Sequence, residues 1–274
     1  MNQGVIPISN FQLALTVLLV MVTGGISAAL RLGLLKSLLW GTVRTFVQLT
    51  LIGYVLTYVF SVNNVWLVLL MVIIMCGIAA RAATGRTPNV PDYPAALGFL
   101  SLVASTFLVG TIVVVLIIAP EPWYSARIVI PIFGMILGNS MNGIALSLDR
   151  LYGEVRSRAG ELEALLAFGA TPWEAVRDCV REAMRAGMTP TINSLMVVGL
   201  VSLPGMMTGQ ILGGADPKSA VRYQIVVMLM IAAAVAIGCL LLVGLSYRRL
   251  FTPDGALEPA VMQSRRMDKA KGSR

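Results

Sequence analysis

Long apolar stretches separated by short polar segments dominate the pattern of hydrophobic and polar positions along this chain. A membrane-spanning helix needs about 20 mostly apolar residues, because the hydrocarbon core is about 30 Å thick and each helical residue rises 1.5 Å. We therefore expect an all-α, polytopic membrane protein with one transmembrane domain. About seven stretches meet the requirement, at 11–30, 43–60, 65–80, 95–119, 127–148, 188–204 and 222–246.

Residues 149–187 have the 3.6-residue periodicity of amphipathic helices in place of a continuous apolar run. The first half, DRLYGEVRSRAGELEALLAF, contains an apolar stripe, and Glu154 stands four residues before Arg158, a spacing that pairs charges on a helix. The second half has its charged residues on the opposite face from a set of small and apolar ones. That set comprises Ala175, Val176, Cys179, Val180 and Ala183. We predict a helical hairpin outside the bilayer.

The turn of this predicted hairpin is marked by four residues with defined helix-end preferences. Gly169 is typical of the position just after a helix C-terminus. Thr171 fits a helix N-cap and Pro172 the first helical position. Glu174, at the third helical position, completes a capping box with Thr171. Together these residues predict a sharp break between two helices.

Two further segments carry several basic residues next to predicted spans. The string RLGLLKSLLWGTVR, residues 31–44, has apolar residues at near-helical spacing beside three basic ones, which predicts a helix lying at the interface. The basic tail, residues 247–274, mixes Gly, Ser and charges of both signs. That composition favours a solvated, partly disordered end, and contact with anionic lipid is the alternative.

The distribution of basic residues predicts the orientation of the chain, because Lys and Arg in short loops stay on the cytoplasmic side. With the N-terminus outside, the cytoplasmic segments hold three basic residues in 31–44, two at Arg81 and Arg86, six in 149–187 and seven in the tail. Only three of the 21 basic residues, Arg127, Lys218 and Arg222, then lie outside. We therefore expect the N-terminus outside and the C-terminus in the cytoplasm.

Composition excludes several classes of function. The chain is 57% hydrophobic and 12% charged, against roughly half and a quarter in soluble domains. Its net charge of +8 is spread over several loops, so it does not indicate a nucleic-acid partner. The absence of histidine excludes His-ligated metal sites, and the three cysteines have no zinc or disulfide spacing. No lysine follows a glycine, so the chain has no P-loop for ATP.

Polar residues inside the predicted spans are candidates for a transport pathway, because such groups face partner helices or water-filled cavities. These residues are Asn139, Ser140 and Asn142 in the fifth span and Asn193 and Ser194 in the sixth. Hydrogen bonds between helices are the alternative role, and the GxxxG spacing of Gly134 and Gly138 predicts close helix approach there. No carboxylate lies deep in a span, which argues against a proton-coupled pump.

The loop LPGMMTGQILGGADP, predicted outside, offers a second group of candidates: Met206, Met207, Gln210 and Asp216. Thioethers suit Cu(I) better than iron, whereas Asp216 and backbone carbonyls suit harder cations. Packing is the alternative role for the methionines, which often fill irregular apolar gaps. The sequence does not identify a metal.

The order Glu163-Ala164-Leu165, three residues, Gly169 resembles the EAA motif, by which importer-type ABC permeases dock into their ATPase subunits. An ordinary capped hairpin is the alternative interpretation. The resemblance extends much further, through ARAATGRTP (80–88), GNSMNGIALSLDRL (138–151), EALLAFGATPWEA (163–175), RAGMTPTINSLMVVGLVSLPGMMTGQILGGADP (185–217) and AVRYQIVVM (220–228). These strings are similar to the FetB-type family of bacterial ABC-transporter permeases.

This resemblance implies a multi-pass permease subunit of the bacterial inner membrane, not an enzyme, that is associated with iron export and has plant relatives linked to aluminium tolerance. It implies a separate ATPase partner that uses the ATP, a permease homodimer, a metal substrate and no cofactor bound by this chain. The implied coupling residues are Glu163, Ala164, Gly169, Thr171, Pro172 and Glu174. The I-x-L-P continuation of the wider permease motif is missing after Gly169. A secondary transporter or channel without an ATPase is the alternative function.

Overall fold

The computed structural model describes residues 8–84, 90 and 95–262. Within these residues every regular element is helical, and strand-type pairing is limited to two isolated bridges. This confirms the predicted all-α class. Arg86 and residues 263–274 of the basic tail lie outside the described residues.

Six segments of the described chain are long and apolar enough to cross a membrane. Each overlaps a predicted span, with shifted ends. They are α1 (Asn10–Leu15) joined to α2 (Val17–Ala29), α3 (Leu35–Val62), α4 (Val65–Thr84), α5 (Ala95–Thr111) joined to the π-helical η1 (Ile112–Ile118), α6 (Ala126–Ser157), and α10 (Pro217–Ser246) joined to the 3₁₀ turn η2 (Tyr247–Leu250).

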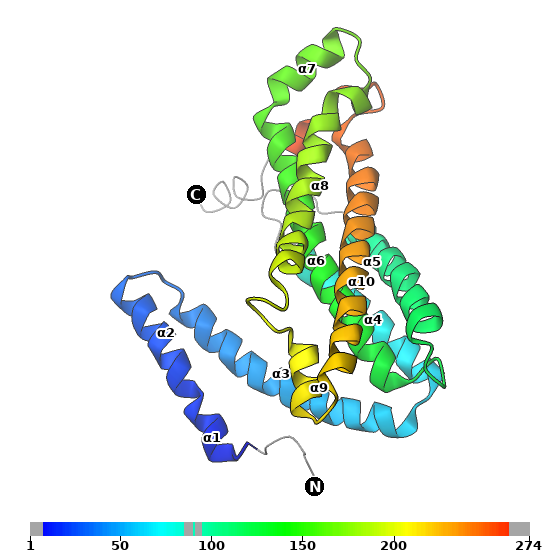
Figure 1. Cartoon of the computed structure of the whole chain (residues 1–274). Helices are drawn as coiled ribbons and strands as arrows, with labels where there is room; N and C mark the ends of the chain where they lie inside the picture. The colour runs from blue at the N-terminus through cyan, green and yellow to red at the C-terminus, as the bar shows by residue number, and fades with distance from the viewer. Residues whose placement is uncertain (1–7, 85–89, 91–94, 263–274) are drawn as a thin grey trace.

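The remaining predicted span, 188–204, corresponds to the second half of α8 (Pro172–Val197) and the turn that follows it. The first half of α8 is charged. After Val197 the chain bends and forms the short α9 (Gly205–Leu212). Figure 1 shows α8 running from the hairpin around α7 (Ala159–Ala167) back toward α9. With α8 counted beside these six segments, the described residues hold seven long helical segments, roughly the expected number of spans.

The helix predicted at 31–44 begins at Leu35 and is continuous with the span predicted after it, so it is the start of α3 and not a separate element. The chain turns at residues 30–34, and α3 then continues without a break from Leu35 to Val62. At 1.5 Å per residue, its 28 residues are about 42 Å long, more than the hydrocarbon core requires. The basic residues near its start therefore belong to the end of a long helix.

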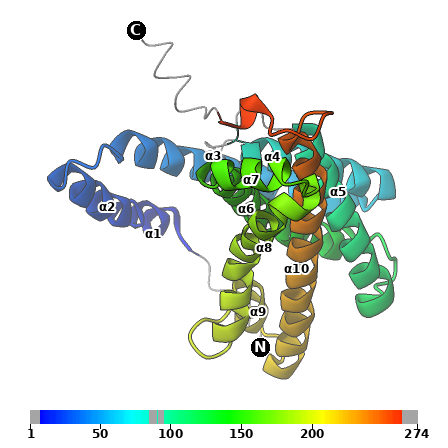
Figure 2. The same cartoon turned by 90° about the horizontal axis from the view of Figure 1, so that it is seen from above.

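The core lies where α6, α8 and α10 pack together, with α4 and α5 against them. Ile136, Ile144 and Leu148 of α6 are fully buried there. In contrast, α1, α2 and α3 extend away from the bundle as an arm, which meets the rest mainly where α3 touches α6 (Figures 1 and 2). Most apolar side chains of the arm are exposed in this single chain.

A close helix approach involves Gly143 of α6 and Gly187 of α8. A Cβ atom on Gly187 would lie 2.7 Å from the Gly143 carbonyl oxygen and 2.9 Å from the Cys239 sulfur. The predicted GxxxG pair does not serve this purpose, because Gly138 has open space beside it and Gly134 meets only the end of the Met75 side chain. Contact between small residues therefore brings α6, α8 and α10 together five residues further along α6.

The first part of the basic tail is folded, which corrects the expectation of a solvated end for residues 247–262. Leu250 and Val261 are buried, and the Arg156 guanidinium donates two hydrogen bonds to the Val261 carbonyl, at 3.2 and 2.9 Å. The 3₁₀ turn η3 (Pro259–Met262) contacts α6. The segment thus joins the end of α10 to the base of the hairpin.

Candidate functional site

The hairpin begins where α6 ends at Ser157, and α7 follows after a break at Arg158. The C-terminus of α7 is closed by Gly169, whose φ of +91° is a left-handed conformation that favours glycine. The Gly169 amide donates to the Leu166 carbonyl and the Ala170 amide to the Leu165 carbonyl, both at 3.0 Å. These bonds form a Schellman motif, which confirms the predicted helix stop.

The next helix, α8, begins with the predicted capping box. The Thr171 hydroxyl and amide donate to the Glu174 carboxylate at 2.7 and 2.8 Å, and the Glu174 amide donates to the Thr171 hydroxyl at 3.3 Å. The bond from the Thr171 hydroxyl, and to a smaller extent the bond from its backbone amide, lowers the pKa of Glu174. Pro172 occupies the first helical position. Only one residue, Ala170, separates the two closed helix ends, so the turn is short and well defined.

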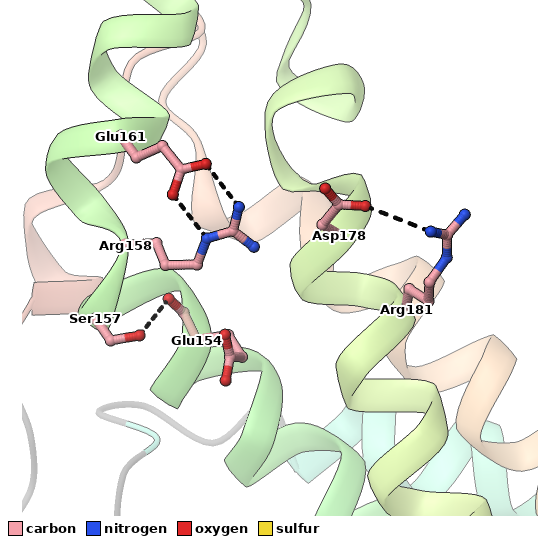
Figure 3. A network of polar contacts seen from close by, with 6 residues as sticks. All are labelled: Glu154, Ser157, Arg158, Glu161, Asp178 and Arg181. Atoms are coloured by element: carbon pink, nitrogen blue, oxygen red, sulfur yellow. Dashed lines mark hydrogen bonds and ion pairs between the residues drawn. The ribbon is translucent and has the colours of Figure 1, made fainter.

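Charged side chains around the hairpin are paired locally (Figure 3). Arg158 donates two hydrogen bonds to Glu161, at 2.9 and 2.7 Å, which lower the pKa of that carboxyl. The expected Glu154–Arg158 pair is replaced, because Glu154 pairs with Arg150 at 2.8 Å. Arg158 pairs with Glu161 instead, although its amide still donates the helical hydrogen bond to the Glu154 carbonyl at 3.0 Å.

The tip of the hairpin presents an apolar side chain to its surroundings. Phe168 is 91% exposed, whereas Leu162, six residues earlier on α7, is fully buried in the core. Glu163 and Ala164 are exposed on α7 beside it. Trp173 packs edge-on against Tyr247, with ring centroids 5.3 Å apart, so the start of α8 is fixed to the end of α10. The tip therefore offers a rigid surface on which Phe168 is the most exposed of several apolar side chains, with Leu165 and Trp173 beside it.

A cavity of about 400 Å³ lies between α6, α8 and α10, bordered by Gly143 and Gly187 and extending from them toward α9. Three helices line it with residues at the i, i+4, i+7 spacing of one helix face. These residues are Met135, Asn139 and Asn142 of α6, Gly187, Thr191 and Ser194 of α8, and Gln224, Met228 and Ile231 of α10. Met206 of α9 and the turn before it close one side.

The structure brings together three of the five predicted pathway residues at this cavity: Asn139, Asn142 and Ser194. Ser140 is fully buried and lies outside the lining, and Asn193 is exposed and also lies outside it. Residues 139 and 140, like 193 and 194, are helix neighbours and therefore point about 100° apart. Only one of each adjacent pair lines the cavity.

The predicted outer-loop residues separate in a similar way. Met206 lines the cavity, whereas Met207 borders a neighbouring apolar cavity of about 310 Å³. Gln210 lies on α9 outside both linings. Asp216 caps α10, accepting hydrogen bonds from the Ser219 amide and hydroxyl at 3.0 and 3.1 Å. The loop is thus partly helical.

Sequence reasoning missed Gln224, Met135 and Met228, which complete the cavity lining. Gln224 had a usable signal, because it is an amide within a 30-residue apolar helix. Met135 and Met228 had no usable sequence signal, because they are as apolar as the residues around them. No group of three or more His, Cys, Asp or Glu side chains in the described residues is arranged to hold a metal ion.

Comparison with known proteins gives a consistent set of matches. A model of the uncharacterised protein family UPF0014 matches residues 10–251. The UPF0014 membrane protein slr1647 of Synechocystis sp. is 43% identical over 222 residues, which cover 80% of this chain and 85% of that protein. The Escherichia coli protein named "Probable iron export permease protein FetB" is 39% identical over 244 residues, 89% of this chain and 93% of that protein.

A plant protein also matches. The Arabidopsis thaliana "Protein ALUMINUM SENSITIVE 3" is 34% identical over 239 residues, which cover 87% of this chain and 86% of that protein. No solved structure matches the chain.

Proposed function

The chain belongs to the UPF0014 family of membrane proteins, and from this we propose that it is the permease subunit of an ABC transporter that exports iron or another metal species. A separate ATPase binds the hairpin tip and supplies the energy of ATP. The exposed Phe168 at the end of a rigid turn is the observation that carries this proposal. A fully exposed aromatic side chain outside the bilayer is typical of a binding surface.

The turn is suited to transmit force because both adjoining helix ends are closed by hydrogen bonds. Movement of the tip acts directly on α8, whose second half lines the cavity. The contact between Trp173 and Tyr247 carries the same movement to α10, which lines the opposite side of the cavity. The cavity thereby changes shape when the ATPase moves.

The orientation places the hairpin in the cytoplasm, with the N-terminus outside and the C-terminus inside. This arrangement needs an odd number of spans, which requires the second half of α8 to cross the membrane along with the six apolar segments. We place the protein in the bacterial inner membrane. The ATPase works as a pair, so two permease copies complete the transporter, and the exposed apolar faces of α1, α2 and α3 are available to the second copy and to lipid.

The experiment that separates this function from an ATPase-independent transporter or channel measures metal efflux from cells. We expect efflux that depends on this gene to stop within minutes when ATP is depleted while the membrane potential is maintained. Efflux that continues at its original rate after ATP depletion would establish the alternative function.

A further inference from the structure

The polar groups that line the cavity present hydrogen-bond acceptors. Gln224 is 6% exposed, and its carbonyl oxygen Oε1 has no hydrogen-bond partner among the described residues. The Asn139 amide group donates to the Met135 carbonyl at 2.9 Å, and the Ser194 hydroxyl donates to the Pro190 carbonyl at 3.0 Å. These bonds leave the Asn139 carbonyl and the lone pairs of Ser194 as acceptors. These oxygen atoms are acceptors that can serve as ligands for a cation.

The charge of that cation is limited by the lining, which contains no charged side chain in the described residues. The cost of moving an ion out of water rises with the square of its charge, and neutral ligands do not cancel the charge. A di- or trivalent ion therefore stays in water or in a chelate. A monovalent ion is the species that neutral ligands hold most readily.

Three thioethers border the same cavity from three different helices: Met135 of α6, Met206 of α9 and Met228 of α10. Met135 and Met206 pack against the core on one side, and all three methionines also line a void of about 400 Å³. The void has room for an ion with several waters, since each water occupies about 30 Å³. Thioether sulfur is a soft ligand and selects soft cations such as Cu⁺.

We propose that this cavity binds a soft monovalent metal ion, Cu⁺ or Ag⁺, through the thioethers of Met135, Met206 and Met228, with the Gln224 carbonyl oxygen as a further ligand. The ion is the transported substrate, and this step rests on the proposed function. Binding itself depends only on the cavity.

The test is a Cu⁺ titration of the purified full-length protein in lipid nanodiscs, under reducing conditions, against a chromophoric Cu⁺ chelator. We expect the wild type to withdraw one Cu⁺ per chain from the chelator. The double variant Met206→Leu/Met228→Leu should bind at least tenfold more weakly, because leucine keeps the volume and removes the sulfur. Ag⁺ should compete with Cu⁺, and Fe²⁺ at the same concentration should not.

Two variants control for other sulfur atoms. Met196→Leu alters a methionine on α8 that is 72% exposed and lies outside the lining, and it should leave Cu⁺ affinity unchanged. Cys239→Ala removes the thiol beneath Gly143 and Gly187 and should also leave it unchanged. Equal affinity in the wild type and the double variant, or loss of binding only in Cys239→Ala, would overturn the assignment.

Failure of this inference and of the proposed function are distinguishable. A preparation that contains the ATPase but binds no Cu⁺ leaves the permease function standing and removes the ion site. Tight Cu⁺ binding by a protein that never assembles with an ATPase supports the cavity assignment and removes the proposed coupling.

Discussion

At the scale of single residues, function depends on a few positions where only one side chain meets the local requirement. Gly169 is required by a positive φ, and nothing lies within 4 Å of the Cβ position there. Glycine is therefore needed at position 169 for its backbone conformation and not because a larger side chain would collide with a neighbour. Gln224 is required by chemistry, because its neighbours on α10 are apolar and it supplies a buried carbonyl oxygen to the cavity.

Replacing Gly169 tests the conformational requirement. Gly169→Val should reduce stimulation of the partner ATPase at least tenfold, because a left-handed conformation costs an ordinary residue about 1–2 kcal/mol and more for a β-branched one. Gly169→Asn should retain much more stimulation, since Asn tolerates that conformation. ATPase rates of the reconstituted complex measure both. Equal rates in the two variants would show that the turn conformation is unimportant.

A negative charge at position 224 tests whether the neutral lining is what keeps divalent ions out of the cavity. Gln224→Glu should increase affinity for Mn²⁺ at least tenfold at pH 8, because the carboxylate offsets part of the divalent charge. Gln210→Glu is the matched control, since Gln210 also has a buried, unpartnered carbonyl oxygen but lies outside the cavity. Equilibrium dialysis of the full-length protein measures both. An unchanged Mn²⁺ affinity in Gln224→Glu would contradict the electrostatic explanation.

At the scale of elements, hydropathy and capping signals predicted most of the helices, because both depend on local sequence. The Gly169 stop and the Thr171–Glu174 box were predictable for this reason. Contacts between segments far apart in the sequence could not be predicted in this way. The approach of Gly143 to Gly187 depends on the angle and position at which α6 crosses α8. Neither a GxxxG spacing nor an isolated glycine fixes that geometry. The three cavity-lining stripes became recognisable only once the helices were placed.

The capping box should contribute measurably to stability. Thr171→Ala should lower the free energy of unfolding by about 1 kcal/mol, the usual value of an N-cap. Because the pKa of Glu174 is lower in the folded state, its contribution is complete above the unfolded pKa near 4.5 and is lost as the pH falls through the lower folded value. Thermal unfolding at pH 7 and at progressively lower pH measures this. A Thr171→Ala variant with wild-type stability at pH 7 would contradict the assignment.

The α6–α8 contact should be intolerant of added volume. Gly187→Ala would place a methyl group 2.7 Å from a backbone oxygen of α6 and even closer to the Ser147 hydroxyl, so we expect a destabilisation of about 1–3 kcal/mol or more. Gly153→Ala, on α6 with open space beside it, should have no such effect. Thermal unfolding in detergent compares the two. Equal melting temperatures would show that α6 and α8 separate easily.

At the scale of the whole molecule, the distribution of charge and exposure divides the chain into a bundle and an arm. The bundle holds the hairpin at one end and the cavity toward the other, whereas α1, α2 and α3 contact it sparingly (Figure 2). The sequence predicted the arm only as spans, because hydropathy does not distinguish a surface facing lipid from one facing another protein. In the proposed homodimer, the exposed apolar faces of this arm are available to the second copy.

The measurement that tests the central claim most directly is copurification of an ATPase with the tagged protein from its native membrane. We expect the wild type to bring down one ATPase subunit per chain. Phe168→Glu should remove it, whereas Phe11→Glu, at an exposed phenylalanine of α1, should retain it if the variant still inserts. The absence of any ATPase from the wild-type preparation, or its retention by Phe168→Glu, would contradict the account.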